Sequence, residues 1–145
     1  MACVKRAAVT VIGFALCICT AATMADIVAV VPTASPVQTL SNNQVADIFL
    51  GKTSRFPTGG HAIPIDQVED SPQRDAFYMK FTGKSAAQLK AHWLKIIFTG
   101  RGQPPRAVSN SAEVKKLVAQ NPNAIGYIDS KDVDDSVRVL TADTP

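Results

Sequence analysis

Short runs of apolar residues alternate along this chain with longer segments whose apolar positions recur every three or four residues. The runs predict buried strands and the periodic segments predict amphipathic helices. The predicted strands cover residues 27–31, 63–65, 124–128 and 137–140. The predicted helices begin after Ser41, Ser71, Ser85 and Asn110. Strands that alternate with helices in this way indicate an α/β layered domain.

Polar residues at the predicted helix starts are suited to capping. Ser41 and Ser85 are each followed three residues later by a glutamine, the spacing of a capping box. Ser71 is suited to the N-cap and Pro72 to the first helical position, where its missing N–H does no harm. Glycines are expected to end three of these helices: Gly51, Gly83 and Gly100.

Proline and glycine positions refine the predicted strands and loops. Pro64 lacks a backbone donor, so its strand is expected at a sheet edge or Pro64 itself at a strand start. Residues 101–107 hold one glycine and two prolines, which predicts a loop.

Residues with catalytic or metal-binding chemistry do not form a motif in this sequence. His61 and His92 have no nearby second ligand, so neither is expected to hold a metal. Trp93, Phe98 and Tyr127 are expected to be core aromatics and not a stacking platform. No serine nucleophile elbow and no complete phosphate-cradling loop is present, so we expect neither an enzyme nor a cofactor.

Residues 1–25 have the pattern of a secretory signal peptide. Lys5 and Arg6 precede an apolar run over residues 7–22, and small residues lead to a cleavage site before Asp26. An uncleaved membrane anchor is the alternative, although the run is short against the ~20 residues that span a bilayer. Lipoprotein processing is disfavoured because the residues before Cys17 and Cys19 are bulky.

Removal of this segment changes the composition of the exported protein. All three cysteines lie within it, so residues 26–145 have no thiol for a disulfide or a zinc site. The loss of Lys5 and Arg6 lowers the formal charge from +3 to +1. A nearly neutral chain gives no electrostatic reason to expect nucleic-acid or membrane binding. We expect residues 26–145 to form a single periplasmic domain.

Several separated blocks of the sequence resemble one family. The first is Leu40 to Lys52 with Phe56-Pro57 just beyond it. The others follow in order: Ile63 to Asp66, Arg74 to Tyr78, Trp93 with Phe98 to Gly100, and Ala124 to Tyr127. Together they resemble phosphate-type substrate-binding proteins, the periplasmic components of phosphate ABC transporters.

The resemblance implies a fold. Members of that family have two α/β lobes that close over an anion, and this chain is similar to one lobe. The strand at residues 27–31 resembles the strand that enters the second lobe, and the family's N-terminal phosphate loop has no counterpart. We therefore expect a single lobe of a type II periplasmic-binding-protein-like (PBP-like) fold, with a short mixed sheet flanked by about four helices.

The resemblance also implies a ligand-binding region at residues 66–74. Ser71 matches the family's anion-binding helix start, while Pro72 stands in place of a glycine and Gln73 in place of a threonine. Asp66 could accept a phosphate proton and Arg74 could contact the anion. Each has a simpler interpretation: Asp66 as a solvated turn residue, Ser71 as an N-cap, and Arg74 as an exposed residue or the partner of a local carboxylate. The region is acidic overall, which disfavours a phosphate dianion.

Two functions follow as hypotheses. The first is an exported phosphate- or oxyanion-binding-like protein with weak or altered binding, whose cleft a second copy of the chain could complete. The alternative is a non-catalytic periplasmic interaction module that docks to an envelope protein. A fold retained without ligand specificity is a third possibility.

Overall fold

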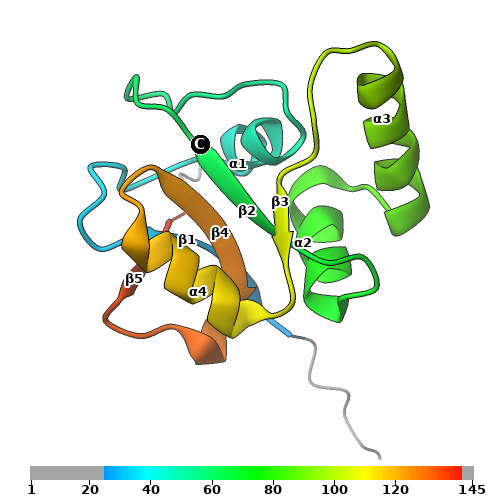
Figure 1. Cartoon of the computed structure of the whole chain (residues 1–145). Helices are drawn as coiled ribbons and strands as arrows, with labels where there is room; N and C mark the ends of the chain where they lie inside the picture. The colour runs from blue at the N-terminus through cyan, green and yellow to red at the C-terminus, as the bar shows by residue number, and fades with distance from the viewer. Residues whose placement is uncertain (1–24, 142–145) are drawn as a thin grey trace, which may run out of the picture.

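A five-stranded mixed sheet runs through the centre of the protein in a computed structural model that describes residues 25–141 (Figure 1). The strands are β1 (Ile27–Pro32), β2 (Ile63–Gln67), β3 (Arg106–Val108), β4 (Ala124–Asp129) and β5 (Val137–Val139). Their order across the sheet is β3-β2-β4-β1-β5. Strand β2 is parallel to β3 and β4, whereas β1 is antiparallel to β4 and β5. The predicted signal peptide lies outside the described residues, apart from Ala25.

Four helices surround this sheet, and the predicted caps place their starts correctly. They are α1 (Asn42–Phe49), α2 (Pro72–Thr82), α3 (Ala86–Phe98) and α4 (Ser111–Gln120), with a short 3₁₀ helix at Ser130–Asp132. Ser41 and Ser85 form complete capping boxes. Gly83 ends α2 with a φ of 67°, a left-handed conformation that favours glycine. The mixed sheet and four helices confirm the predicted α/β fold class.

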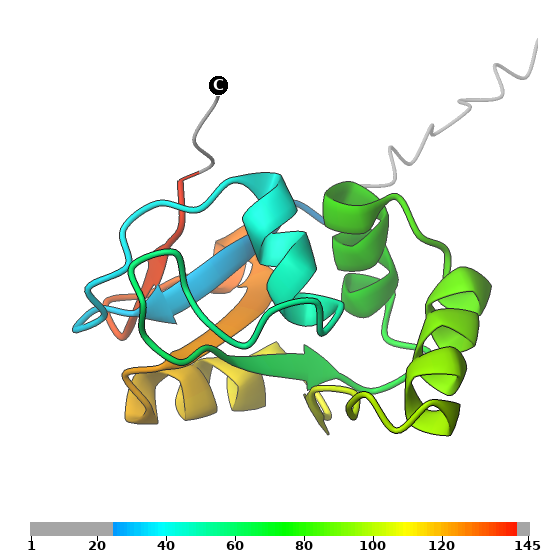
Figure 2. The same ribbon diagram turned by 90° about the horizontal axis from the view of Figure 1, so that it is seen from above.

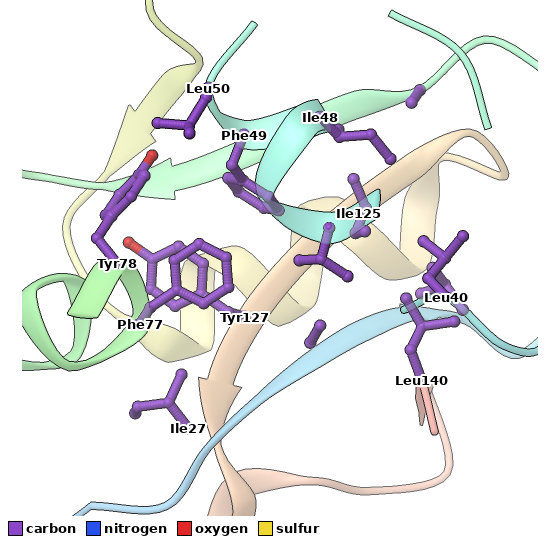
Figure 3. Packing of buried hydrophobic residues seen from close by; sticks show 14 of the residues in the cluster. Ile27, Leu40, Ile48, Phe49, Leu50, Phe77, Tyr78, Ile125, Tyr127 and Leu140 are labelled. Carbon is purple, nitrogen blue, oxygen red and sulfur yellow. The ribbon is translucent and has the colours of Figure 1, made fainter. Parts of the chain in front are cut away.

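The sheet separates two layers of helices. Figure 2 shows α1 and α2 on one face, α4 on the other, and α3 at the side of the molecule. The larger core cluster lies on the α1 and α2 face, where Phe49, Phe77 and Tyr127 pack together (Figure 3). The rings of Phe77 and Tyr127 are stacked with centroids 4.0 Å apart. Tyr127 is therefore a core aromatic, as the sequence predicts.

Helix α4 approaches the other face of the sheet closely at Gly126. A Cβ atom at this position would lie 2.5 Å from Val114 Cγ1 and 2.9 Å from Val118 Cγ2. Both valines are fully buried. The absent side chain of Gly126 thus allows α4 to pack against β4.

Pro64 lies near the start of β2, in agreement with one of its two predicted positions. It pairs with Ile125 of β4, and the pairing of β2 with β3 begins only at Ile65. The missing N–H of Pro64 therefore removes no bond to β3.

Two predictions are wrong. The loop predicted for residues 101–107 ends early, because Arg106 begins β3 alongside Ile65. This strand has three residues, too few to show alternation in the sequence. Phe98 is 84% exposed and lies outside the core. It is five residues after the buried Trp93, about 140° further round the helix, so both cannot face the core.

Within residues 25–141, no helix is long and apolar enough to cross a membrane.

Candidate oxyanion site at the ends of β2 and β3

Two helix starts lie at the same end of the sheet. Because β2 and β3 are parallel, their carboxyl ends meet at one edge. Ser71 caps α2 a few residues after β2, and Asn110 caps α4 a few residues after β3. Ligands of open α/β sheets bind at the carboxyl ends of strands. All four candidate residues, Asp66, Ser71, Gln73 and Arg74, lie at this edge.

Asp66 is the most buried charged residue of this region, with 3% exposure. One carboxylate oxygen accepts a hydrogen bond from Tyr127 Oη and a 2.8 Å bond from the backbone N–H of Gln67. The other accepts a 2.8 Å bond from Tyr78 Oη and pairs with Arg74 Nε at 3.4 Å. The alternative of a solvated turn residue is therefore wrong, because four donors surround a buried carboxylate.

The two tyrosines that donate to Asp66 have a shifted pKa. Burial, and then the negative charge of Asp66, raises the pKa of Tyr78 and of Tyr127 far above the usual value. Both phenols therefore stay protonated and serve as donors to Asp66. Asp66 anchors β2, α2 and β4 to one another.

Ser71 is an N-cap, as the simpler interpretation predicts. Its Oγ accepts a hydrogen bond from the N–H of Arg74 at 3.4 Å and donates one to Gln67 Oε1 at 2.9 Å. The side-chain oxygen of Gln73 lies 3.2 Å from the same Oγ. Ser71 and Gln73 thus form a connected polar group at the start of α2.

Gln67 is a polar core residue that sequence reasoning missed. It is 1% exposed, and its Nε2 donates to the carbonyl oxygen of Tyr127 at 3.4 Å and to Ser111 Oγ at 3.5 Å. The side chain therefore links the starts of α2 and α4. Strand alternation could have revealed it, since Gln67 follows the buried Ile65 by two positions and must share its face of the sheet.

Arg74 is a local carboxylate partner and not a freely exposed residue. Its side chain is 11% exposed, pairs with Asp66 and lies with Cζ 5.3 Å from the ring centroid of Tyr78. It also lines a surface cavity of about 200 Å³ with Glu69, Asp70, Ala86, Ala87 and Lys90. Lys90 comes from α3, so the cavity has two acidic and two basic side chains. Its charge is more balanced than the sequence of residues 66–74 suggests.

No group of three or more histidine, cysteine or acidic side chains among residues 25–141 could hold a metal ion.

These elements define the class of the protein: an α/β domain with the fold of one lobe of phosphate ABC transporter substrate-binding proteins. One similar solved structure is the phosphate-bound form of a protein assigned to that class from Clostridium perfringens. The two share 28% sequence identity with a TM-score of 0.66, over 82% of this chain and 45% of the other.

Two further solved structures have the same fold. An ABC-type phosphate transport receptor from Vibrio cholerae is 21% identical with a TM-score of 0.65, over 83% of this chain and 47% of the other. PstS from Borrelia burgdorferi is 13% identical with a TM-score of 0.60, over 83% and 48%. The predicted resemblance is therefore confirmed at the level of the fold.

The similarity to these structures covers only part of each of them. No family model and no curated protein matches the sequence. The chain spans less than half the length of the solved structures it resembles. Those structures are binding proteins and not enzymes by their descriptions.

Proposed function

We propose that this protein is an exported, non-catalytic solute-binding-like protein that takes phosphate or another small oxyanion at the start of α2. The observation that carries the proposal is its similarity to the phosphate-bound protein from Clostridium perfringens. Export to the periplasm rests on the signal-like residues 1–25. Transport through an ABC transporter would then follow from the class of its structural relatives.

The side chains at this edge support an anion site of low affinity. Arg74 and Lys90 line the cavity as cations, and the first turn of α2 contributes the positive end of its dipole. Three features weaken the attraction. Pro72 removes one backbone donor, Arg74 already pairs with Asp66, and Glu69 and Asp70 line the same cavity.

A second copy of the chain would complete the cleft. The chain covers only 45% and 47% of two solved relatives, and in this proposal a second copy supplies the rest of the cleft. Lys90 lies in the cavity, and Leu94 and Phe98 follow it at four-residue spacing on the same side of α3. Leu94 is 46% exposed and Phe98 is 84% exposed. A copy that covers the cavity would therefore also cover this apolar row.

The test is a thermal-unfolding panel on the purified protein in phosphate-free buffer, with phosphate, sulfate, molybdate and small carboxylates added one at a time. A ligand at a hundred times its dissociation constant stabilises a fold by about 2.7 kcal/mol, which raises Tm by roughly 10 °C for a domain of this size. We expect phosphate or one other oxyanion to raise Tm, and Arg74→Ala to abolish the rise.

The readout is the ligand-induced change in Tm, because Arg74→Ala also removes the pair with Asp66 and lowers the starting Tm. Lys116→Ala, at an exposed position on α4, is the matched control and should keep the full response. An unchanged response in Arg74→Ala would place the anion elsewhere. No response to any oxyanion at millimolar concentration would end the proposal.

A second candidate function is a protein-interaction module. The exposed apolar side chains of α3 favour it, since Leu94, Ile97 and Phe98 have no partner that covers them in the described chain. In this function α3 docks another envelope protein instead of a second copy, and the oxyanion has no role.

A further inference from the structure

A larger cavity lies at the opposite end of the parallel strands. It has a volume of about 520 Å³ and is lined by three segments together with Ile48 of α1 and Trp93 and Ile96 of α3. The three segments are the turn after α1, the beginning of β2, and the loop that joins α3 to β3 (Figure 1). Binding sites for small molecules have volumes of about 300 to 1,000 Å³. The cavity is therefore large enough for a small organic ligand, and it shares no lining residue with the cavity at the candidate oxyanion site.

Backbone hydrogen bonds hold the walls of this cavity. Gly51 N–H donates to the carbonyl of Ile48, and Ala62 N–H donates to the carbonyl of Ser54 at 2.8 Å. On the other side, Arg101 N–H donates to the carbonyl of Ile96 at 3.1 Å. These bonds fix the turn after α1 and the end of α3, so the cavity is built before a ligand arrives.

The charged side chains that line the cavity are all basic. They are Lys52, Arg101 and Arg106, with His61 as a fourth titratable group, and no acidic residue is among the lining residues. Arg101 and Arg106 take part in none of the ion pairs found among residues 25–141. Lys52 pairs with Asp47 at 3.4 Å, but both side chains are largely exposed and the pair is screened by solvent. Two arginines without carboxylate partners favour an anion.

The rest of the lining is apolar and includes a buried indole. Trp93 is 5% exposed, and its Nε1 is buried without a hydrogen-bond partner. Ile48, Ala62 and Ile96 line the cavity with it. A buried donor without a partner is costly, because it has lost its hydrogen bond to water. Because the Nε1 atom is closed to solvent, a ligand in the cavity meets the apolar ring of Trp93 and not its N–H.

We infer that this cavity binds a small organic anion, a carboxylate or phosphate group carried on a compact apolar body. Arg101 and Arg106 recognise the anionic group, and the apolar walls around Trp93 take the body. This site is separate from the oxyanion site at the start of α2 and does not depend on it. An inorganic oxyanion would fill only the charged part of the cavity.

Trp93 is the only tryptophan of the chain and lines this cavity, so in the folded protein a change in its emission reports on its surroundings there. The purified protein is titrated with benzoate, phenyl phosphate, inorganic phosphate and benzyl alcohol. We expect a saturable change in emission with benzoate or phenyl phosphate, and binding at least tenfold weaker with inorganic phosphate and benzyl alcohol. The two organic probes distinguish a preference for carboxylate from one for phosphate.

Variants assign the interaction to named side chains. The double variant Arg101→Ala/Arg106→Ala should weaken binding of the organic anion at least tenfold, and Arg101→Lys should retain more of it. Lys116→Ala, at an exposed position on α4, should bind as the wild type does. The indole N–H resonance of Trp93 in nitrogen–proton correlation spectra is a second readout and should shift on binding.

Two outcomes would overturn the inference. One is the absence of any saturable change, in both fluorescence and the indole resonance, with benzoate and phenyl phosphate at millimolar concentration. The other is binding of the organic anions that Arg101→Ala/Arg106→Ala leaves unchanged, or that benzyl alcohol matches. A response lost in Arg74→Ala instead would assign the ligand to the oxyanion site.

Discussion

Asp66 has a structural role, although it lies among the residues proposed to bind a ligand. It lies at the candidate oxyanion site, but its lone pairs are occupied by two phenols, a backbone N–H and Arg74. A buried carboxylate with this many donors has its acceptor capacity satisfied by the protein itself. Its first contribution is therefore to hold α2 and β4 against β2.

The two phenols lead to a prediction about alkaline pH. Tyr78 and Tyr127 are the only tyrosines of the chain, and both have a raised pKa in the folded state. A raised folded-state pKa gives stability that is complete below the unfolded pKa, near 10, and is lost as the pH rises above it. We expect the free energy of unfolding to fall above pH 10, by about 1.4 kcal/mol per pH unit for each tyrosine.

The measurement is an alkaline titration that follows phenolate absorbance and circular dichroism together. Phenolate should form only as the native dichroism is lost. Phenolate absorbance that developed near pH 10 with full native dichroism would show that the phenols are not protected by Asp66 and burial.

At this scale the sequence reveals local interactions better than distant ones. The N-cap role of Ser71 could be predicted because its partner, the N–H of Arg74, is three residues away. The pairing of Asp66 with Tyr127 could not, because the two residues are 61 positions apart and meet only through the sheet. The candidate site could therefore be located from the sequence, but its network of hydrogen bonds could not.

At the scale of elements, the helices and most strands were predictable from capping residues and apolar periodicity. Strand β3 was not, because its three residues are defined by their pairing with β2 and only Val108 among them is buried. The exposed end of α3 was also missed, since an apolar residue on a helix does not show which neighbour will cover it. Both errors concern contacts between elements.

The contact between α4 and β4 gives a prediction about stability. Gly126→Ala places a methyl group against Val114 and Val118, on a buried face where neither valine can move away freely. Overpacking of this kind costs about 1–3 kcal/mol. Denaturant unfolding followed by Trp93 fluorescence should show a loss of this size.

Two further variants make this test specific. Gly60→Ala is the control: its nearest contact would be Phe56 Cδ2 at 4.0 Å, so its effect should stay within about 0.5 kcal/mol. Adding Val114→Ala to Gly126→Ala should recover part of the loss, because it removes the closer clash. Equal stability of Gly126→Ala and the wild type would mean that α4 shifts without cost.

At the scale of the molecule, the chain covers less than half of each solved structure it resembles, and it exposes an apolar row on α3. Large exposed apolar patches on small proteins mark interaction sites. The fold could be predicted because the sequence blocks that resemble phosphate ABC transporter substrate-binding proteins extend from Leu40 to Tyr127. The state of assembly could not, since the sequence does not separate apolar residues that fill the core from those that face a partner.

We expect the protein to form a dimer through α3. Sedimentation should show dimers of the wild type at micromolar concentration, and Leu94→Ser/Phe98→Ser should shift them to monomers. Met79→Ser, an exposed apolar position on α2, is the matched control and should leave the dimer intact. A wild-type monomer at all concentrations would exclude the second copy and favour the interaction module.

The position of β1 between β4 and β5 has a consequence for the kinetics of folding. This strand comes first in the described chain, yet Ile27 pairs with Asp129 and Val30 pairs with Val139. Its hydrogen bonds must wait for the last strands to be synthesised, and closing so long a loop slows folding. A growing chain therefore cannot complete its sheet until β4 and β5 have both emerged.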